Sequence, residues 1–225
     1  MSTPSRPPAR RAGQRAGLSS DQILVAARHI ADREGVDHLS MRRLSAELGV
    51  MPNALYSYFP DKEALLDALL DSLLGEIEMP DPTSVEWRDG LTALMDSSRR
   101  LLLAHPQLVT TFISRAAVGP NATRLGETTF QLLRQGGLDG ERAVDAFRIL
   151  LIFTLGFAAF QTPRMEGDAS RTRRVRSVFG TLPDDGFPEM RRAAQHLAKR
   201  PTDRSFHTGL GWLLQGVNTS NEKAT

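Results

Sequence analysis

The spacing of apolar residues constrains this chain more than any other feature of its sequence. Apolar side chains recur every three or four positions over most of the 225 residues, which is the period of an amphipathic helix. We find no convincing run in which apolar and polar residues alternate, as they do in a half-buried β-strand. We therefore predict an all-α fold of about ten helices, in which a small three-helix unit precedes a larger helical bundle.

The N-terminal part of the chain contains start and stop signals for three short helices. Ser19 and Gln22 form a capping box for the first helix, and Gly35 is expected to end it in the left-handed conformation. A second short helix follows. The third begins at Pro52, whose missing N–H costs nothing at the first helical position, and it is expected to run to Phe59.

Two prolines in the segment 78–83 mark the clearest internal boundary. Beyond it, Thr83 and Glu86 are expected to form a second capping box, and Asp139 to cap a long helix. Residues 163–186 are rich in proline, glycine, aspartate and arginine, so we expect an exposed loop there. The predicted parts are a disordered basic arm (1–17), a three-helix unit (18–62), a connector helix (63–78), a helical bundle (83–217) and a disordered tail (218–225).

Basic residues are concentrated at the N-terminus, although the whole chain carries a formal charge of only +2. Residues 1–62 contain nine Lys and Arg against six Asp and Glu, and four of these arginines precede the first acidic residue. A basic arm ahead of a small folded unit favours a polyanionic partner. A disordered solubilising tail fits the composition equally well.

Several classes of function lack their sequence signals. The chain has no cysteine, which excludes disulfides, thiolate metal sites and thiol catalysis. Its N-terminus has no apolar stretch typical of a signal peptide, and the longest apolar run, 149–160, is too short to span a bilayer. We expect a cytoplasmic protein without a membrane partner. No nucleophile–base set, phosphate-binding glycine loop or metal-ligand spacing is present, so we predict no enzyme activity, cofactor or metal, although folding could still assemble a site from distant residues.

Two short predicted helices flank Gly49 and Val50 in the proportions of a helix-turn-helix. In such a unit the second helix enters the DNA major groove, so its outward side should be small and polar. That side is formed by Asn53, Ala54, Ser57 and Tyr58. Contacts to phosphates, which position the protein without reading the sequence, are expected from Tyr56, Arg42, Arg43 and Lys62.

The only two tyrosines of the chain, Tyr56 and Tyr58, both lie in this segment. Either their hydroxyls reach acidic groups on DNA, or their rings are half-buried packing residues with solvated tips, which is the commoner fate of tyrosine. The basic residues nearby could likewise form an ordinary solvated surface. A helix–glycine–helix segment alone is a weak signal, and its combination with the arm, the tyrosines and the connector favours DNA binding.

Residues 19–70 resemble the DNA-binding module of the TetR family of bacterial repressors, through the run LSMRRLSAELGVMPNALYSYFPDKEALLDALL. The remainder, to about residue 217, is similar to the ligand-binding domain of tetracycline repressors. The resemblance implies DNA contacts from Arg42, Pro52, Asn53, Ala54, Tyr56, Ser57, Tyr58 and Lys62. Met51 stands where the family usually has a Ser or Thr cap, and a missing cap costs about 1 kcal/mol.

The resemblance also implies a homodimer and a small-molecule effector. The dimer interface is expected on residues 143–160 and 206–217, and two-fold symmetry predicts a pseudo-palindromic operator on double-stranded DNA. Effector binding is expected to move the connector helix and so to separate the two recognition helices.

Four positions that hold a metal chelate in tetracycline repressors are occupied differently here. They fall on Phe112, Phe160, Glu78 and Leu94. Phenylalanine cannot ligate a hard cation, so we expect a largely apolar organic effector rather than a metal-chelated tetracycline. The candidate pocket residues are Glu78, Leu94, Ser98, Phe112, Arg115, Thr128, Phe153, Phe157, Phe160 and Gln161. Many of these aromatic residues could instead belong to the core.

Two further features have simple interpretations. His105, before Pro106, is interpreted as a residue that favours a helix C-terminus rather than as a ligand contact. The arginine cluster at 171–176 is interpreted as part of an exposed loop rather than as an anion site. The predicted function is a DNA-binding transcriptional regulator, namely a repressor released by its effector. The alternatives are control by protein contacts, activation instead of repression and, more remotely, an all-α enzyme.

Overall fold

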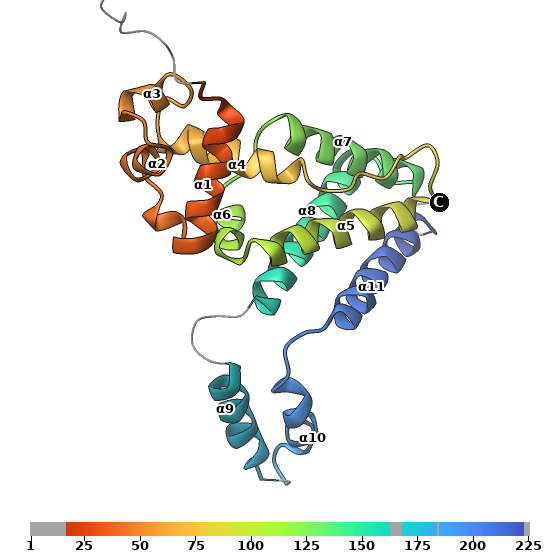
Figure 1. Ribbon diagram of the computed structural model, residues 1–225. Coiled ribbons are helices and arrows are strands. Elements are labelled where there is room, and N and C mark those ends of the chain that lie inside the picture. The colour runs from red at the N-terminus through yellow and green to blue at the C-terminus, as the bar shows by residue number, and fades with distance from the viewer. Residues whose placement is uncertain (1–16, 163–167, 184, 223–225) are drawn as a thin grey trace, which may run out of the picture.

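The computed structural model describes residues 17–162, 168–183 and 185–222, and these residues form helices and connecting turns without a β-strand (Figure 1). The predicted all-α fold is confirmed. Two short 3₁₀ helices, Val36–His38 and Pro106–Leu108, accompany the α-helices. The α-helices are α1 (Ser20–Glu34), α2 (Met41–Leu48), α3 (Pro52–Tyr56), α4 (Lys62–Leu74), α5 (Trp87–Ala104), α6 (Val109–Ser114), α7 (Pro120–Gln135), α8 (Gly140–Gln161), α9 (Asp168–Gly180), α10 (Pro188–Leu197) and α11 (Asp203–Glu222).

The capping box that starts α1 forms as predicted, because Ser19 and Gln22 each accept a hydrogen bond from the other's backbone N–H. Gly49 ends α2 in the left-handed conformation, with φ 66° and ψ 29°. Gly35 also has a positive φ, 91°, but its ψ of 157° is extended. The predicted left-handed end of α1 is therefore wrong. The chain turns directly into the 3₁₀ helix instead, through a conformation that glycine adopts far more readily than other residues.

Helix α3 is shorter than predicted, because it ends at Tyr56 rather than at Phe59. Met51 precedes it, and no side chain makes a capping hydrogen bond there. Leu55 is fully buried and Phe59 is 8% exposed, so both belong to the core of the three-helix unit. A helix of this length is marginal by itself, and packing of these two side chains holds it in place.

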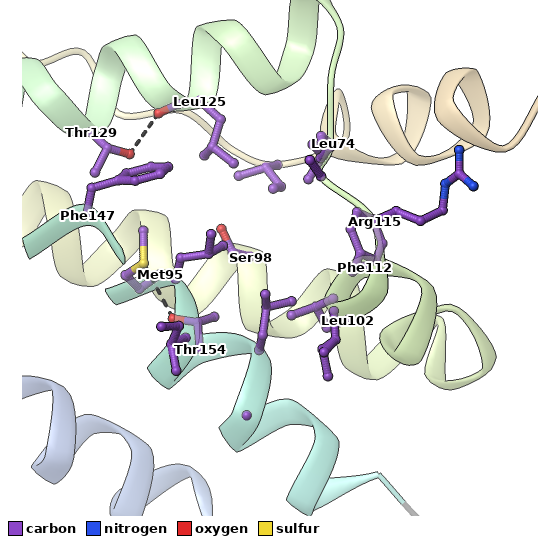
Figure 2. Close-up of a pocket in the computed structure, with 18 of the residues that line it drawn as sticks. Leu74, Met95, Ser98, Leu102, Phe112, Arg115, Leu125, Thr129, Phe147 and Thr154 are labelled. Carbon is purple, nitrogen blue, oxygen red and sulfur yellow. Dashed lines mark hydrogen bonds between the residues drawn. The ribbon is translucent and has the colours of Figure 1, made fainter. Parts of the chain in front are cut away.

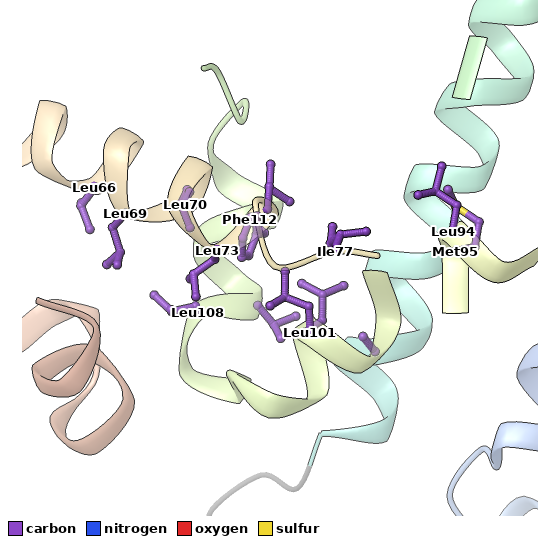
Figure 3. Packing of buried hydrophobic residues seen from close by; sticks show 14 of the residues in the cluster. Leu66, Leu69, Leu70, Leu73, Ile77, Leu94, Met95, Leu101, Leu108 and Phe112 are labelled. Atoms are coloured by element: carbon purple, nitrogen blue, oxygen red, sulfur yellow. The ribbon is translucent and has the colours of Figure 1, made fainter. Parts of the chain in front are cut away.

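One continuous apolar core joins the three-helix unit to the bundle, and α4 lies between them (Figure 3). Leu66, Leu69 and Leu73 of α4 are nearly fully buried, and they pack in the same cluster as Leu108 and Phe112 of the bundle. Because α4 belongs to both parts, a displacement of this helix changes the packing of both.

Helix α5 packs against α4, α7, α8 and α11. Its predicted apolar stripe is buried and comprises Trp87, Leu91, Leu94, Met95, Leu101 and Leu102. The predicted capping box at its start is wrong. Glu86 caps the helix with its own carboxylate, which accepts from the N–H groups of the next turn, whereas Thr83 bonds to Asp81. The Asp81 turn satisfies Thr83 locally and removes it from the helix.

Helix α8 carries apolar side chains both on the sides that face the bundle and on a side that faces solvent. It has 22 residues and a mean hydropathy of 1.9, which by length and composition suffices to cross a membrane, yet only 28% of the apolar stretch is buried. Its predicted cap, Asp139, makes no capping hydrogen bond. Ile149 and Ile152 are 50% and 70% exposed, and Trp212 of α11 is 70% exposed. Ile149 and Trp212 border the same shallow groove, so α8 and α11 present a joint apolar face.

Helices α9 and α10 lie side by side and apart from the rest of the bundle (Figure 1). The predicted loop is wrong for residues 168–180, which are helical, while 163–167 and 184 lie outside the described residues. Its arginines interrupt any apolar stripe, which is why the helix was not predicted. Pairing with α10, where Ala194 is buried, stabilises it. Helix α11 also continues past the predicted end at residue 217. Residues 1–16 of the predicted arm and the end of the tail, 223–225, lie outside the described residues.

Candidate DNA-binding surface and ligand cavity

The outward side of α3 carries part of the predicted DNA-binding set. Asn53 and Ser57 are exposed, and the Tyr56 side chain is 50% exposed. Pro52 and Ala54 are half-buried beside them. Because Leu55 anchors the opposite side of the helix in the core, these side chains face solvent together. A short helix with small polar groups on its free side has the shape that the major groove accepts.

The two tyrosines have different environments. Tyr56 is half exposed, and its hydroxyl is available to a phosphate oxygen. Tyr58 is half-buried, and its hydroxyl donates a hydrogen bond to the carbonyl oxygen of Leu18, 2.5 Å away. This proton cannot serve a phosphate at the same time. The prediction of Tyr58 as a DNA contact is therefore corrected: its bond fixes the chain at the start of α1.

A matched pair of substitutions distinguishes the two roles. Tyr56→Phe removes a solvent-exposed hydroxyl that is predicted to contact a phosphate, so we expect DNA affinity to fall about tenfold on every sequence, with no change in folding stability. Tyr58→Phe removes the bond to Leu18, so we expect the free energy of unfolding to fall by about 1 kcal/mol. Fluorescence anisotropy with labelled DNA and urea denaturation measure these quantities. Equal losses of DNA affinity in both variants would contradict the assignment.

The basic residues that were predicted to contact phosphates also have different environments. Arg42 is exposed, and no acidic side chain among the described residues pairs with it. Arg43 instead joins α1 to α2, because its guanidinium lies 3.0 Å from a Glu34 oxygen and 2.8 Å from a Glu47 oxygen. Lys62 donates to the carbonyl oxygen of Val36 at 3.2 Å. Arg43 is thus corrected to an intramolecular contact. Lys62 keeps two further N–H donors, so Lys62 and the exposed Arg42 stay predicted phosphate contacts.

Hydrogen bonds from Arg43 and Arg33 hold the pKa of Glu34 at about 2, below the ordinary value of 4.5. A carboxyl group with a depressed pKa stabilises the fold above its unfolded-state pKa, and this contribution is lost as pH falls toward the folded-state value. We therefore expect Glu34→Gln to destabilise the chain by a constant amount at neutral pH, and the difference from the parent to shrink as pH falls from about 4.5 toward about 2. Urea midpoints for both proteins across this range provide the measurement. Since the pair is open to solvent, added salt should reduce the difference.

Helix α4 is tied to the bundle by an acidic row on one of its sides. Arg115, which follows α6, lies 2.6 Å from an Asp67 oxygen and also pairs with Glu63. One turn further along α4, the buried Asp71 accepts from the backbone N–H of Ala122 at 2.9 Å. Asp71 therefore caps the N-terminus of α7 from another helix. The segment between α6 and α7 is thus attached to the connector at both of its ends.

A second contact between the two parts surrounds His105, which is only 5% exposed. Its Nδ1 lies 2.9 Å from an Asp32 oxygen, and its Nε2 lies 2.9 Å from a guanidinium nitrogen of Arg28. Arg28 in turn pairs with Glu76. An imidazole with its proton on Nδ1 satisfies both neighbours. His105 is thus a junction between α1 and the end of α5, a role that its position before Pro106 did not indicate.

A cavity of about 480 Å³ lies between α4, α5, α6, α7 and α8 (Figure 2). This volume is within the usual range for small-molecule sites. Its wall is mainly aliphatic and aromatic. The lining residues are Leu74, Ile77, Met95, Ser98, Leu102, Phe112, Ile113, Ser114, Arg115, Ala116, Ala117, Leu125, Thr129, Phe147, Leu151, Ile152, Thr154, Leu155 and Gly156.

Only three of the ten predicted pocket residues line this cavity, namely Ser98, Phe112 and Arg115. The other seven are Glu78, Leu94, Thr128, Phe153, Phe157, Phe160 and Gln161. Leu94 and Thr128 are buried outside the cavity, Phe160 is 63% exposed, and Glu78 is exposed. The prediction that these four residues line the cavity is therefore wrong.

The remaining three corrections concern the side of α8 that faces α11. Phe153 and Phe157 both pack on Phe206, with ring centroids 5.3 Å apart in each case. Gln161 bonds to the buried Arg99 at 2.9 Å. The missed residues Phe147 and Thr154 lie on the other side of the helix, seven positions apart. A spacing of seven residues places two side chains on the same side of a helix, so the sequence did indicate that Phe147 and Thr154 belong together. Because both sides of α8 are apolar, the sequence did not indicate which side lines the cavity.

Comparisons with known proteins support the arrangement just described. Residues 23–69 match the model for bacterial regulatory proteins of the tetR family, and residues 79–220 match the model for the tetracyclin repressor-like C-terminal domain. The chain belongs to the TetR family. It is accordingly a DNA-binding transcriptional regulator and not an enzyme.

Among curated TetR relatives, the chain is 36% identical to the HTH-type transcriptional repressor DrrR1 of Streptomyces coeruleorubidus over 157 residues, which is 69% of this chain and 58% of DrrR1. It is 30% identical to an HTH-type transcriptional regulator of Saccharopolyspora erythraea over 75% of this chain and 77% of the relative. Among solved structures it resembles the Streptomyces coelicolor TetR family protein ActR in complex with actinorhodin, with a TM-score of 0.83 and 34% identity over 90% of this chain and 96% of ActR.

The positions that resemble the metal-chelate positions of tetracycline repressors lie mostly outside the cavity. Of the four positions compared with tetracycline repressors, only Phe112 lines the cavity. The described lining residues include no Asp, Glu, His, Asn or Gln. Their polar groups are hydroxyls and one guanidinium, a donor set that fits neither magnesium nor a transition metal.

Proposed function

We propose that this TetR-family chain is a dimeric repressor, released from its operator by a small, largely apolar organic molecule that is not a metal-chelated tetracycline. The observation that carries the proposal is that one segment serves two purposes. Residues 114–117 form part of the cavity wall, and Arg115 within this segment pairs with Asp67 and Glu63 of the connector α4. A ligand that displaces this wall therefore acts directly on α4.

The joint apolar face of α8 and α11 supports the dimer. Ile149 and Trp212 are at least half exposed on it, which is unusual for neighbouring side chains of this size in a soluble monomer. A second copy related by two-fold symmetry would cover the same face on both chains. The two α3 helices of the dimer then enter successive major grooves, ~34–36 Å apart, on a pseudo-palindromic site.

Release follows as a shift between two conformations of the dimer. Ligand in the cavity favours the arrangement in which residues 114–117 lie further from the bundle axis. The ion pairs of Arg115 and the Asp71 cap transmit this displacement to α4, while the His105 junction holds α1 as the pivot. The spacing of the two α3 helices then no longer matches the groove repeat, and DNA affinity falls.

The cavity also supports the chemical part of the proposal. Its lining is dominated by Leu, Ile, Ala, Phe and Met side chains, and no metal-binding group of three or more His, Asp or Glu occurs among the described residues. The related ActR has been crystallised with actinorhodin, an organic ligand. A regulator of this kind acts in the cytoplasm, where its operator lies.

Selection of bound fragments from a random DNA pool tests the proposal. We expect a pseudo-palindromic motif, and we expect a panel of uncharged organic compounds to contain some that lower the affinity for it. Compounds that bind the cavity and leave operator affinity unchanged would overturn release by an effector. Increased affinity would instead indicate activation or co-repression, and a strictly monomeric chain in solution would overturn the dimer.

The same selection repeated with Asn53→Ala tests the recognition helix. Asn53 is exposed on α3, where its amide can pair with a base edge. We expect discrimination at one position of each half-site to fall about tenfold, whereas affinity for unrelated DNA stays the same. An unaltered motif would show that Asn53 does not read a base.

A further inference from the structure

We infer that the effector is an uncharged aromatic molecule with hydroxyl groups that donate hydrogen bonds to the wall of the cavity. The inference rests on the proposed function, because it assigns a chemical class to the effector of that same site. It is derived from the way in which the polar groups of the wall are already engaged within the protein.

Three hydroxyls of the wall donate to their own helices. Thr129 donates to the carbonyl oxygen of Leu125, four residues earlier, at 2.7 Å (Figure 2). Ser98 likewise donates to the carbonyl oxygen four residues earlier at 2.8 Å, and Ser114 donates to the carbonyl oxygen three residues earlier at 3.3 Å. A hydroxyl whose proton is engaged retains only its lone pairs as free hydrogen-bonding capacity. These positions therefore present acceptors to the cavity. A ligand group that bonds to them must supply an O–H or N–H.

Thr154 differs from the other hydroxyls. It is buried and donates to the sulfur of Met95 at 3.4 Å, and a thioether is a weak acceptor. Its proton can therefore turn to a ligand carbonyl at little cost, while its lone pairs can accept from a ligand hydroxyl. Thr154 is the position at which the wall tolerates either kind of ligand group.

The wall does not favour a ligand with a full charge. Arg115 is the only charged residue among the described lining residues, and its guanidinium already pairs with Asp67 and Glu63. A ligand carboxylate would have to compete with both. A ligand cation finds no carboxylate in the lining. An ion buried without a partner loses far more in hydration than a hydrogen bond returns.

The aromatic part of the inference comes from the ends of the cavity. Figure 2 shows Phe147 and Phe112 on either side of Ser98. Phe147 also stacks on Phe130, with ring centroids 5.1 Å apart, so its ring has a fixed orientation. A flat ring system can lie against these faces while its edge hydroxyls reach the side chains between them.

Three fluorescent probes with one ring system test the polar group alone. Hydroxypyrene, methoxypyrene and pyrenecarboxylate are titrated against the full chain. We expect hydroxypyrene to bind about tenfold more tightly than methoxypyrene, which can only accept, and the carboxylate to bind at least about a hundredfold more weakly than hydroxypyrene. Equal binding of the hydroxyl and the ether, tighter binding of the carboxylate, or no binding of hydroxypyrene would each overturn the inference.

Nearly isosteric variants locate the acceptors. We expect Ser98→Ala, Ser114→Ala, Thr129→Val or Thr154→Val to bring the hydroxypyrene-to-methoxypyrene affinity ratio to about one for at least one position. Thr128→Val is the matched control, since Thr128 is the buried neighbour of Thr129 and does not line the cavity. A ratio that persists in all four variants would contradict the assigned acceptors.

The binding assay and the release assay separate this inference from the proposed function. The expected ranking of probes without any effect on operator affinity would mean that the effector chemistry is right and release by an effector is wrong. Release from the operator by methoxypyrene or pyrenecarboxylate, bound at least as tightly as hydroxypyrene, would mean that release by an effector is right and the inferred effector chemistry is wrong.

Discussion

Replacing Gly156 by leucine is expected to leave the protein on its operator at effector concentrations that release the parent chain. Gly156 lies in α8 and lines the cavity, and a Cβ added there meets no atom within 4 Å. A leucine side chain therefore enters the empty volume and takes the place of the ligand. We expect the effector, or hydroxypyrene as a probe, to bind at least about a hundredfold more weakly, because a close-packed site does not yield to a bulky ligand.

Gly126→Leu is the matched control for that variant. Gly126 also lies within a helix, α7, and a Cβ there also meets no atom within 4 Å, but the residue does not line the cavity. Both substitutions should stabilise the fold by up to about 1 kcal/mol, because leucine is a better helix former than glycine. Only Gly156→Leu should abolish the response. A response lost equally in both variants would point to a general stiffening and not to occupation of the cavity.

Replacing Gly119 by alanine is expected to lower the free energy of unfolding by about 3 kcal/mol. Gly119 has φ 147°, a conformation that L side chains rarely adopt. A Cβ at this position would lie 2.3 Å from the carboxyl carbon of Asp71 and 2.4 Å from one of its oxygens. The buried carboxylate would have to leave the N-terminus of α7, so the substitution adds backbone strain to the loss of a cap. Urea denaturation provides the measurement.

A double-mutant cycle with Asp71→Ala separates the two contributions. When the carboxylate is absent, Gly119→Ala should cost at least about 1 kcal/mol less than it does in the parent, because only the backbone strain remains. Gly126→Ala in the same helix should be neutral or slightly stabilising. A cost for Gly119→Ala that does not depend on Asp71 would contradict the close approach of the two residues.

Local rules predicted much of the fold because the interactions concerned are local in the chain. The Ser19–Gln22 capping box and the left-handed Gly49 involve atoms only a few residues apart. The buried stripe of α5 follows from a spacing that hardly any other structure satisfies. The helix-turn-helix and its exposed residues Asn53 and Tyr56 could be predicted on the same basis.

The remaining features depend on partners that lie far apart in the chain. The hydroxyl of Tyr58 bonds to Leu18, 40 positions away, and no spacing rule distinguishes it from Tyr56. The sequence predicted that Arg43 contacts phosphate, whereas in the folded chain Arg43 pairs with Glu34 of α1. On α8 both sides are apolar, so periodicity alone could not decide that Phe147 and not Phe153 meets the cavity.

In the proposed dimer, the uncovered side of α8 and α11 also links gene control to protein dosage. A chain that buries this side only against a second copy of itself binds the operator as a dimer. At low abundance the number of pairs follows the square of the amount made, so a cell that halves synthesis of the chain keeps about a quarter of its competent particles. Under the proposed function, repression then weakens by more than the change in synthesis, without any effector.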